Sequence, residues 1–186
     1  MKKSNLILLS ALGALLFFSL AFQLSVHSYV REGDANKVPA RMVSENRLVS
    51  SFNSISIDSR IKVLYQQKET PSLTIEAPNH LIDSIHTSVL NEELIIEITK
   101  SLKKKDSITI RIDNPELTSL SLGGKAHFKT LGKVSGEKLN LMFSDESSGD
   151  LELSYNLLKH KNTSTGIVNI KGKINQVEFS NKKKEE

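Results

Sequence analysis

The amino-acid sequence predicts an all-β domain wound as a β-solenoid of short strands, preceded by an N-terminal hydrophobic helix. Short segments that alternate polar and apolar residues fill the chain from residue 51 onward, as expected of strands that bury one face. No long amphipathic helical segment occurs after residue 50. From residue 120, apolar residues also recur every nineteen positions, and a repeat of about this length suits one coil of stacked strands.

Residues 1–30 are predicted to be a signal or transmembrane anchor. Two N-terminal lysines precede an uncharged run from Leu6 to Phe22, and this order is typical of export signals. The run exceeds the usual apolar core of a cleaved signal, so we expect an uncleaved anchor that sends the rest of the chain outward. Cleavage after Ala21 or Ser28 is the alternative. The anchor would place in the membrane the side chains of Leu6, Leu9, Leu12, Leu15, Phe18 and Phe22.

The remaining chain divides into three parts. Residues 31–50 have mixed charges and no sustained period, which predicts a linker. Residues 51–181 form the predicted β-solenoid domain, and residues 182–186 a charged tail. Alternation predicts strands within residues 52–65, 72–77, 93–99 and 106–113. Residues 78–92 are expected to be irregular or extended, with a short helix opened by Asn79 as the alternative.

The nineteen-residue repeat predicts how the coils stack. One column is Leu120, Leu139, Leu158 and Val177, and a second, two positions later, is Leu122, Leu141, His160 and Phe179. Each unit ends in a short piece after a glycine, namely GKAHF, GDLEL and GIVNI. We expect glycines at the corners and a shared apolar column inside. A hairpin turn at Gly123 and Gly124 within an antiparallel sandwich is the alternative, but successive hairpins have no reason to keep a fixed long period.

The composition excludes several kinds of site. The chain has no cysteine, which excludes disulfides, thiolate metal sites and cysteine nucleophiles. The formal net charge is +4, but no basic helix or basic-aromatic stripe accompanies it, so nucleic acid is not an expected partner. The basic cluster at residues 100–106 is interpreted as a solvated turn. Nucleotide-binding glycine motifs and a nucleophile elbow are also lacking.

The domain resembles the head GIN domain of putative auto-transporter adhesins, from about Phe52 to Ser180. The resemblance rests on FNSISIDSRIKVLYQQ, on LTIEA and LIIEI, on PELTSLSLGGKAHF and on the later GDLEL and GIVNI pieces. It implies a right-handed β-helix-like domain in the bacterial cell envelope, facing the periplasm or the exterior, with no established enzymatic activity. The middle repeat departs from the family pattern, because it carries MFSDESSGD at residues 142–150 where a shorter glycine-rich corner is usual.

That departing loop gathers the only candidate ligands for an ion. Asp145, Glu146 and Asp150 lie there among three serines, and calcium prefers several oxygen ligands. The spacing does not fit an EF-hand, and an exposed polar turn is the alternative. The same carboxylates, with Glu152, are the only nominees for a glycosidase or lyase. No pair of histidines has the spacing of a zinc site, and no cofactor is expected.

The sequence therefore predicts a non-enzymatic, envelope-anchored binding, adhesin-like or scaffolding domain that presents a solenoid surface. A carbohydrate-active enzyme on the same scaffold is the alternative. Expected partners are the membrane, through the N-terminal helix, and a glycan or protein ligand; a homodimer through an open end of the solenoid is also expected. The outward positions include Lys125, His127, Lys129, Asn140, Glu152, Asn169 and Lys171.

Overall fold

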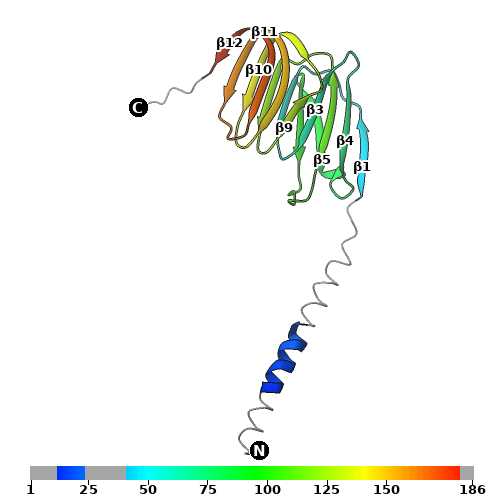
Figure 1. Ribbon diagram of the computed structural model, residues 1–186. Coiled ribbons are helices and arrows are strands. Elements are labelled where there is room, and N and C mark those ends of the chain that lie inside the picture. Colours follow the sequence, from blue (N-terminus) through cyan, green and yellow to red (C-terminus); the bar gives the residue numbers. More distant parts are fainter. Residues whose placement is uncertain (1–11, 24–40, 181–186) are drawn as a thin grey trace, which may run out of the picture. The chain divides into compact units, whose positions relative to one another are not determined.

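A computed structural model of the chain describes residues 12–23 and 41–180 (Figure 1). The chain divides into two units, Met1–Ala40 and Arg41–Glu186. In the first unit, residues 12–23 form a helix, and its predicted anchor side chains Leu12, Leu15, Phe18 and Phe22 are exposed. Leu6 and Leu9 lie outside the described residues. Among the helices that are described, none combines the length and the apolar character needed to cross a membrane.

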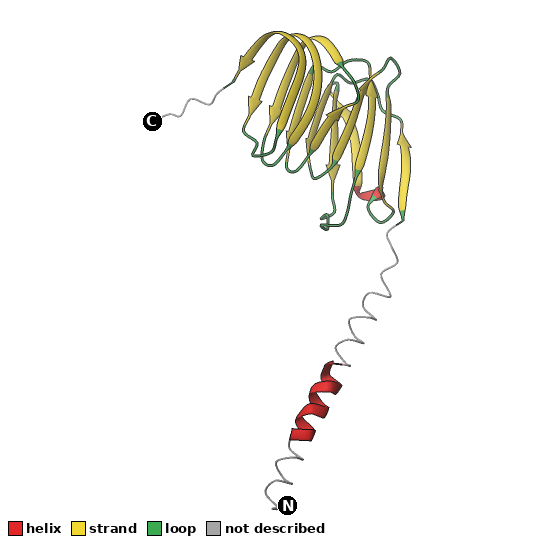
Figure 2. Ribbon diagram, viewed as in Figure 1, coloured by secondary structure: helices red, strands yellow, loops and turns green. Residues whose placement is uncertain are grey.

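The second unit is almost entirely β (Figure 2). Within residues 41–180, one turn of 3-10 helix, η1, covers Ile82–Ser84. The strands, in chain order, are β1 Met42–Arg47, β2 Ser54–Asp58, β3 Lys62–Gln67, β4 Ser72–Pro78, β5 Ile85–Leu90, β6 Glu93–Ile98, β7 Thr109–Asn114, β8 Ser119–Gly123, β9 His127–Thr130, β10 Val134–Phe143, β11 Ser148–Asn162 and β12 Val168–Phe179.

All twelve described strands belong to one sheet that is curled over the core. The order is β1-β4-β7-β3-β9-β11-β10-β8-β2-β6-β5, and β12 pairs with β11. One stack of parallel strands runs β6-β2-β8-β10, and a second runs β7-β3-β9-β11. The long strand β11 joins the stacks, because residues 148–150 pair with β9 and residues 153–162 pair with β10. The predicted all-β class is confirmed, and the right-handed solenoid winding stays a prediction.

The glycine pair at 123 and 124 forms a corner between the two stacks. β8 and β9 flank the pair but do not pair with each other, since each runs parallel to strands of its own stack. The hairpin alternative is therefore wrong for this segment. Gly124 has φ +55, and a Cβ there would come 3.2 Å from the amide nitrogen of Ser59. Both the left-handed backbone and the close approach of the neighbouring corner favour glycine.

Apolar columns from successive strands fill the interior. Ile55 pairs with Leu94 on one side and with Leu120 on the other, and Leu120 pairs with Leu141. All four side chains are at most 2% exposed, and burial of such a side chain contributes roughly 1.5–3 kcal/mol. The core is thus a ladder of side chains that runs across the strands of the sheet.

The register confirms the nineteen-residue spacing in part. Leu139 pairs with Leu158, and Leu158 pairs with Val177, as predicted. Leu120, however, pairs with Leu141, twenty-one residues later, and not with Leu139. The coil that leads from β8 to β10 is two residues longer than the coils that follow, so the earliest repeat is offset from the predicted columns.

Antiparallel strands complete the N-terminal end of the unit. β1 pairs with β4, β4 with β7, and β5 with β6. β1 lies within the predicted linker at 31–50, so residues 42–47 form a strand of the folded unit, which begins at Arg41; residues 31–40 lie outside the described residues. β5 and η1 lie in the segment 78–92, where the structure is extended apart from one short helical turn.

One arginine links the two edges of the curled sheet. The Arg47 guanidinium, at the end of β1, donates hydrogen bonds to the backbone oxygens of Ile82 and Ile85 and to Thr87 Oγ1. Ile85 and Thr87 belong to β5, so the first and last strands of the sheet order are held together by one side chain.

Candidate functional site

Outward side chains of β9, β11 and β12 form a polar face on the second stack. Buried residues alternate with them: Phe128 lies between two outward residues of β9, and Leu151 between two of β11. The register arranges the outward residues in rows across the strands, about 4.8 Å apart. We call this set the polar face; it comprises His127, Lys129, Ser148, Asp150, Glu152, Asn169 and Lys171.

Side chains in each row contact one another. Asn169 Nδ2 donates a hydrogen bond of 2.9 Å to Asp150 Oδ1, and Lys171 Nζ lies 3.4 Å from Glu152 Oε2. His127 Nδ1 lies 2.9 Å from Ser148 Oγ. These contacts position the Asp150 carboxylate, the Glu152 carboxylate and the Asn169 amide in rows across the strands.

A hollow of about 290 Å³ lies in the polar face. Its floor is formed by Leu151 and Thr130, and its walls carry both hydrogen-bond donors and acceptors. Paired acceptors and donors at strand spacing suit a ligand with neighbouring hydroxyl groups, which can donate and accept at once. The lining residues are Lys129, Thr130, Asp150, Leu151, Glu152, Asn169 and Lys171.

The face also brings together Ser148, His127 and Asp150, a combination that the sequence did not indicate, although His127 and Asp150 were each named as candidates. His127 lies beside Ser148, but its Nε2 is 3.8 Å from Asp150 Oδ2, which is too long for a hydrogen bond. A nucleophilic triad needs both contacts to be hydrogen bonds, so the cluster does not have that geometry. The twenty-one-residue offset between β9 and β11 was the signal that would have revealed it.

A basic corner adjoins the polar face through His127. Arg60, Lys62, Lys104 and Lys125 line a shallow pocket of about 250 Å³ there, together with buried Asp106. Asp106 accepts a hydrogen bond of 2.8 Å from the Lys103 backbone amide and so closes the turn. The lysines at 103–105 are exposed, as expected for a solvated turn.

The predicted ion ligands do not converge. Asp145 Oδ2 accepts hydrogen bonds from the Gly124 amide at 3.0 Å and from Ser144 Oγ at 3.1 Å, so this carboxylate braces the corner. Glu146 pairs with Lys125 at 2.8 Å, whereas Asp150 belongs to the polar face. Within residues 12–23 and 41–180, no group of three or more His, Cys, Asp or Glu side chains could hold a metal ion.

The nominated catalytic carboxylates are divided in the same way. Asp150 and Glu152 line the hollow, but Asp145 and Glu146 do not. Of the predicted outward positions, Lys125 lies at the basic corner, and Asn140 lies on β10, in the other stack. The remaining five predicted positions belong to the polar face.

Two tyrosines are buried in the core and so cannot serve as general acids at the surface. Tyr65 and Tyr155 are at most 3% exposed, and their hydroxyls donate to the backbone oxygens of Asn114 and Leu117 at 3.1 and 2.7 Å. Burial raises the pKa of both phenols well above the usual range. They are therefore neutral hydrogen-bond donors that serve packing.

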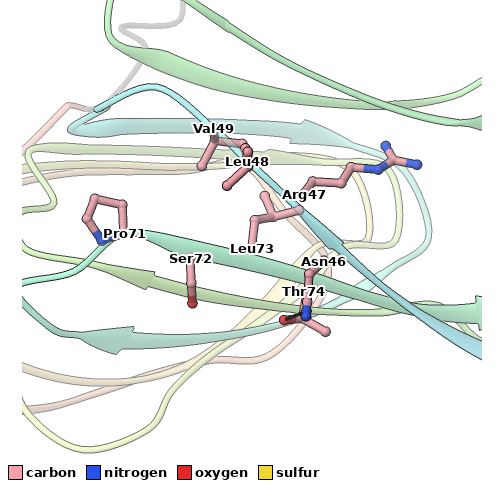
Figure 3. A pocket seen from close by; sticks show the side chains of 8 residues that line it. All are labelled: Asn46, Arg47, Leu48, Val49, Pro71, Ser72, Leu73 and Thr74. Atoms are coloured by element: carbon pink, nitrogen blue, oxygen red, sulfur yellow. Dashed lines mark hydrogen bonds between the residues drawn. The ribbon is translucent and has the colours of Figure 1, made fainter.

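A second pocket, of about 380 Å³, lies where β1 meets β4 (Figure 3). Its polar contact is a 2.7 Å hydrogen bond from Thr74 Oγ1 to Asn46 Oδ1, and its apolar part includes Leu48 and Leu73. The Arg47 side chain extends away from the other labelled residues (Figure 3) and is bonded to β5. The Asn46 amide oxygen is thus already bonded within the pocket, and the lining contains no carboxylate, in contrast to the polar face.

A family model described as putative auto-transporter adhesin, head GIN domain, matches residues 51–183. The chain belongs to this family. The resemblance noted in the sequence is thereby confirmed for this GIN domain, and β1 precedes the matched region. No curated protein matches the chain.

Solved structures share the fold of the GIN domain at low identity. A putative adhesin from Bacteroides fragilis NCTC 9343 has 22% identity and a TM-score of 0.62, over 70% of this chain and 61% of that one. A putative adhesin from Parabacteroides distasonis ATCC 8503 has 14% identity and a TM-score of 0.65, over 76% and 70%. A putative lipid binding protein from the same organism has 16% identity and a TM-score of 0.57, over 75% and 70%. The chain thus spans less than two thirds of the Bacteroides fragilis protein.

Proposed function

We propose that this GIN domain is a non-enzymatic binding domain that holds a glycan against its polar face. The observation that carries the proposal is the hollow lined by Asp150, Glu152 and Asn169. Carboxylate oxygens accept hydrogen bonds, and an amide both donates and accepts them, so together these groups can bind sugar hydroxyls, which also do both. The adhesin-like family supports a binding role at the envelope or the cell surface.

The proposal also covers the winding of the domain and its attachment to the membrane. The strands would be coils of a right-handed β-solenoid, a winding that the two stacks of parallel strands support. The N-terminal segment would remain uncleaved and hold the domain at the membrane. The polar face would then be available to glycans outside the cytoplasm, because a signal of this kind sends the rest of the chain outward.

A glycan panel tests the proposal. Full-length protein in detergent is applied to immobilised envelope and host polysaccharides, and we expect saturable binding to at least one class. Asp150→Ala with Asn169→Ala should weaken that binding at least about 10-fold, because hydrogen bonds to charged groups are worth about 1.5–3 kcal/mol. Asn140→Ala is the matched control, since Asn140 is exposed on the other stack.

Two results would contradict the proposal. Equal binding by the polar-face variant and the Asn140 control would place the ligand elsewhere on the surface. Release of shortened sugars, abolished by Asp150→Asn or Glu152→Gln, would identify a carbohydrate-active enzyme. The two results can be told apart, because binding and cleavage are measured on the same glycans.

A further inference from the structure

The C-terminal end of the curled sheet is open. In the described part of the chain, β12 pairs with β11 along one edge, and no described strand pairs with its other edge. The opposite end of the sheet is completed by antiparallel strands, so the two ends differ. An unpaired edge of twelve residues is a template for another strand.

The apolar columns also reach the open end uncovered. Ile174, Val177 and Phe179 continue the interior columns of Tyr155, Leu158 and His160 in the register of β11 and β12. Phe179 is 69% exposed and Val177 is 42% exposed, whereas Leu158 is 2% exposed. The last coil therefore presents an unfinished apolar surface beside its free backbone edge.

The inside–outside alternation of β12 is interrupted once, at Asn175 and Gln176, and we call this interruption the bend. Ile174 and Val177 pair in register with the buried residues Tyr155 and Leu158 and so lie on the inner side, and the two residues between them, Asn175 and Gln176, are exposed. The same interruption occurs in β10, where Glu137 and Lys138 are both exposed. In an antiparallel pair, directly opposed residues face the same side. Two copies of β12 can therefore pair along their length only where their bends coincide, which puts the twofold axis between Asn175 and Gln176.

This single register makes the strand complementary to itself. It opposes Ile174 to Val177 of the second copy, and Phe179 to Gly172. On the outer side it opposes Lys173 to Glu178. Lys173 makes no ion pair with the described residues, and Glu178 already pairs with Lys159 at 2.7 Å, so the row of alternating charge continues into the second copy.

We propose that the chain forms a closed homodimer by antiparallel pairing of residues 172–179 of β12 with the same residues of a second copy. The contact is isologous, so it uses both open ends and leaves neither exposed. An amide row at the bend supports it: Asn175 Nδ2 donates to Asn156 Oδ1 at 2.7 Å, and Gln176 of the second copy would extend this row. The dimer would leave both polar faces accessible, and it does not depend on the identity of their ligand.

Disulfide formation tests the register, because the natural chain has no cysteine. In full-length protein, Lys173→Cys with Glu178→Cys should give covalent dimers on mild oxidation. Within one chain these positions are five residues apart on a strand, about 17 Å, which is beyond the reach of a disulfide. Each single cysteine variant is the matched control and should stay monomeric on a non-reducing gel, because the register keeps identical positions apart.

A charge reversal provides a second measurement without cysteine. Lys173→Glu places like charges opposite each other twice per dimer, and it should raise the dissociation constant about 10-fold in sedimentation equilibrium. Lys138→Glu, at the exposed bend of β10, is the control and should leave the constant unchanged. Monomers at all concentrations, a dimer that neither cysteine pairing nor charge reversal affects, or equal crosslinking by the single variants would overturn the proposal. Monomers at all concentrations would be expected if residues 181–186 covered the free edge of β12. A dimer that is insensitive to both changes would be expected if residues 1–30 mediated the association.

Discussion

His160 is an ionisable residue that lies between two aromatic rings of the apolar columns. Its ring lies 6.1 Å from that of Phe143 and 6.0 Å from that of Phe179, measured between centroids. Its Nε2 is buried without a hydrogen-bond partner. Burial lowers the pKa of the imidazole below its ordinary value of 6.5, because the charged form loses its hydration. Folding therefore favours the neutral form of this histidine.

The lowered pKa predicts an acid-sensitive fold. The unfolded chain binds a proton to this imidazole more readily than the folded chain does, so unfolding is favoured as the pH falls below about 6.5. Above that value the contribution to stability is complete and constant. We expect the free energy of unfolding, measured in urea from pH 5 to pH 8, to fall on the acid side, and His160→Leu to reduce that dependence.

An exposed histidine separates this effect from general acid sensitivity. His86 lies on the exposed side of β5, and His86→Gln should keep the full pH dependence of the natural chain. An unchanged dependence in His160→Leu would show that the buried imidazole is not its source. A core leucine at this position also fits the column, since Leu141 occupies the preceding place in the same register.

Among the strands, β1 depends on Arg47 for its contact with β5. The guanidinium donates to three oxygens on η1 and β5, and the side chain is 19% exposed. Removing a part-buried charged donor leaves those acceptors unpaired, which costs roughly 1–3 kcal/mol. We expect Arg47→Ala to lower the free energy of unfolding by about this amount and to increase hydrogen exchange in both edge strands.

Arg111 is a matched control in the same sheet. Its side chain is 50% exposed and pairs with Glu76 at 3.2 Å, and an exposed ion pair of this kind is worth about 0–1 kcal/mol. Arg111→Ala should therefore change stability little and leave exchange in β5 unaffected. Equal losses for both variants would mean that Arg47 acts as an ordinary surface charge and does not join the sheet edges.

The strands differ in how clearly the sequence predicts them. Ile55 and Ile57 alternate with polar residues and are both buried, so β2 could be predicted from its pattern alone. β1 has the sequence MVSENR and no fully buried residue, because it lies at an edge and gains stability from backbone pairing with β4. Such a strand leaves no period in the sequence, which is why it fell within the predicted linker.

For the molecule as a whole, the nineteen-residue repeat predicted the residues of the interior better than it predicted the contacts of the polar face. The columns through Leu139 and Leu158 follow from a repeat that packing imposes on the sequence. The polar face does not, since no packing requirement links Asp150 to Asn169 or His127 to Ser148. Those contacts depend on coil lengths of nineteen and twenty-one residues, and a slip of one residue in the pairing register would turn each side chain of the strand to the opposite face.

The attachment of the chain to the membrane gives the last prediction. If residues 1–30 are retained, the protein should sediment with membranes, resist carbonate extraction and require detergent for release. Sequencing of the purified chain should then begin at residue 1 or 2.

A cleaved signal predicts the opposite result, with a mature chain that begins near Phe22 or Tyr29 and is released without detergent. The folded unit begins at Arg41 and contains every residue of the polar face, so its glycan binding should survive in either case. Retention at the membrane would depend on residues 1–30 alone.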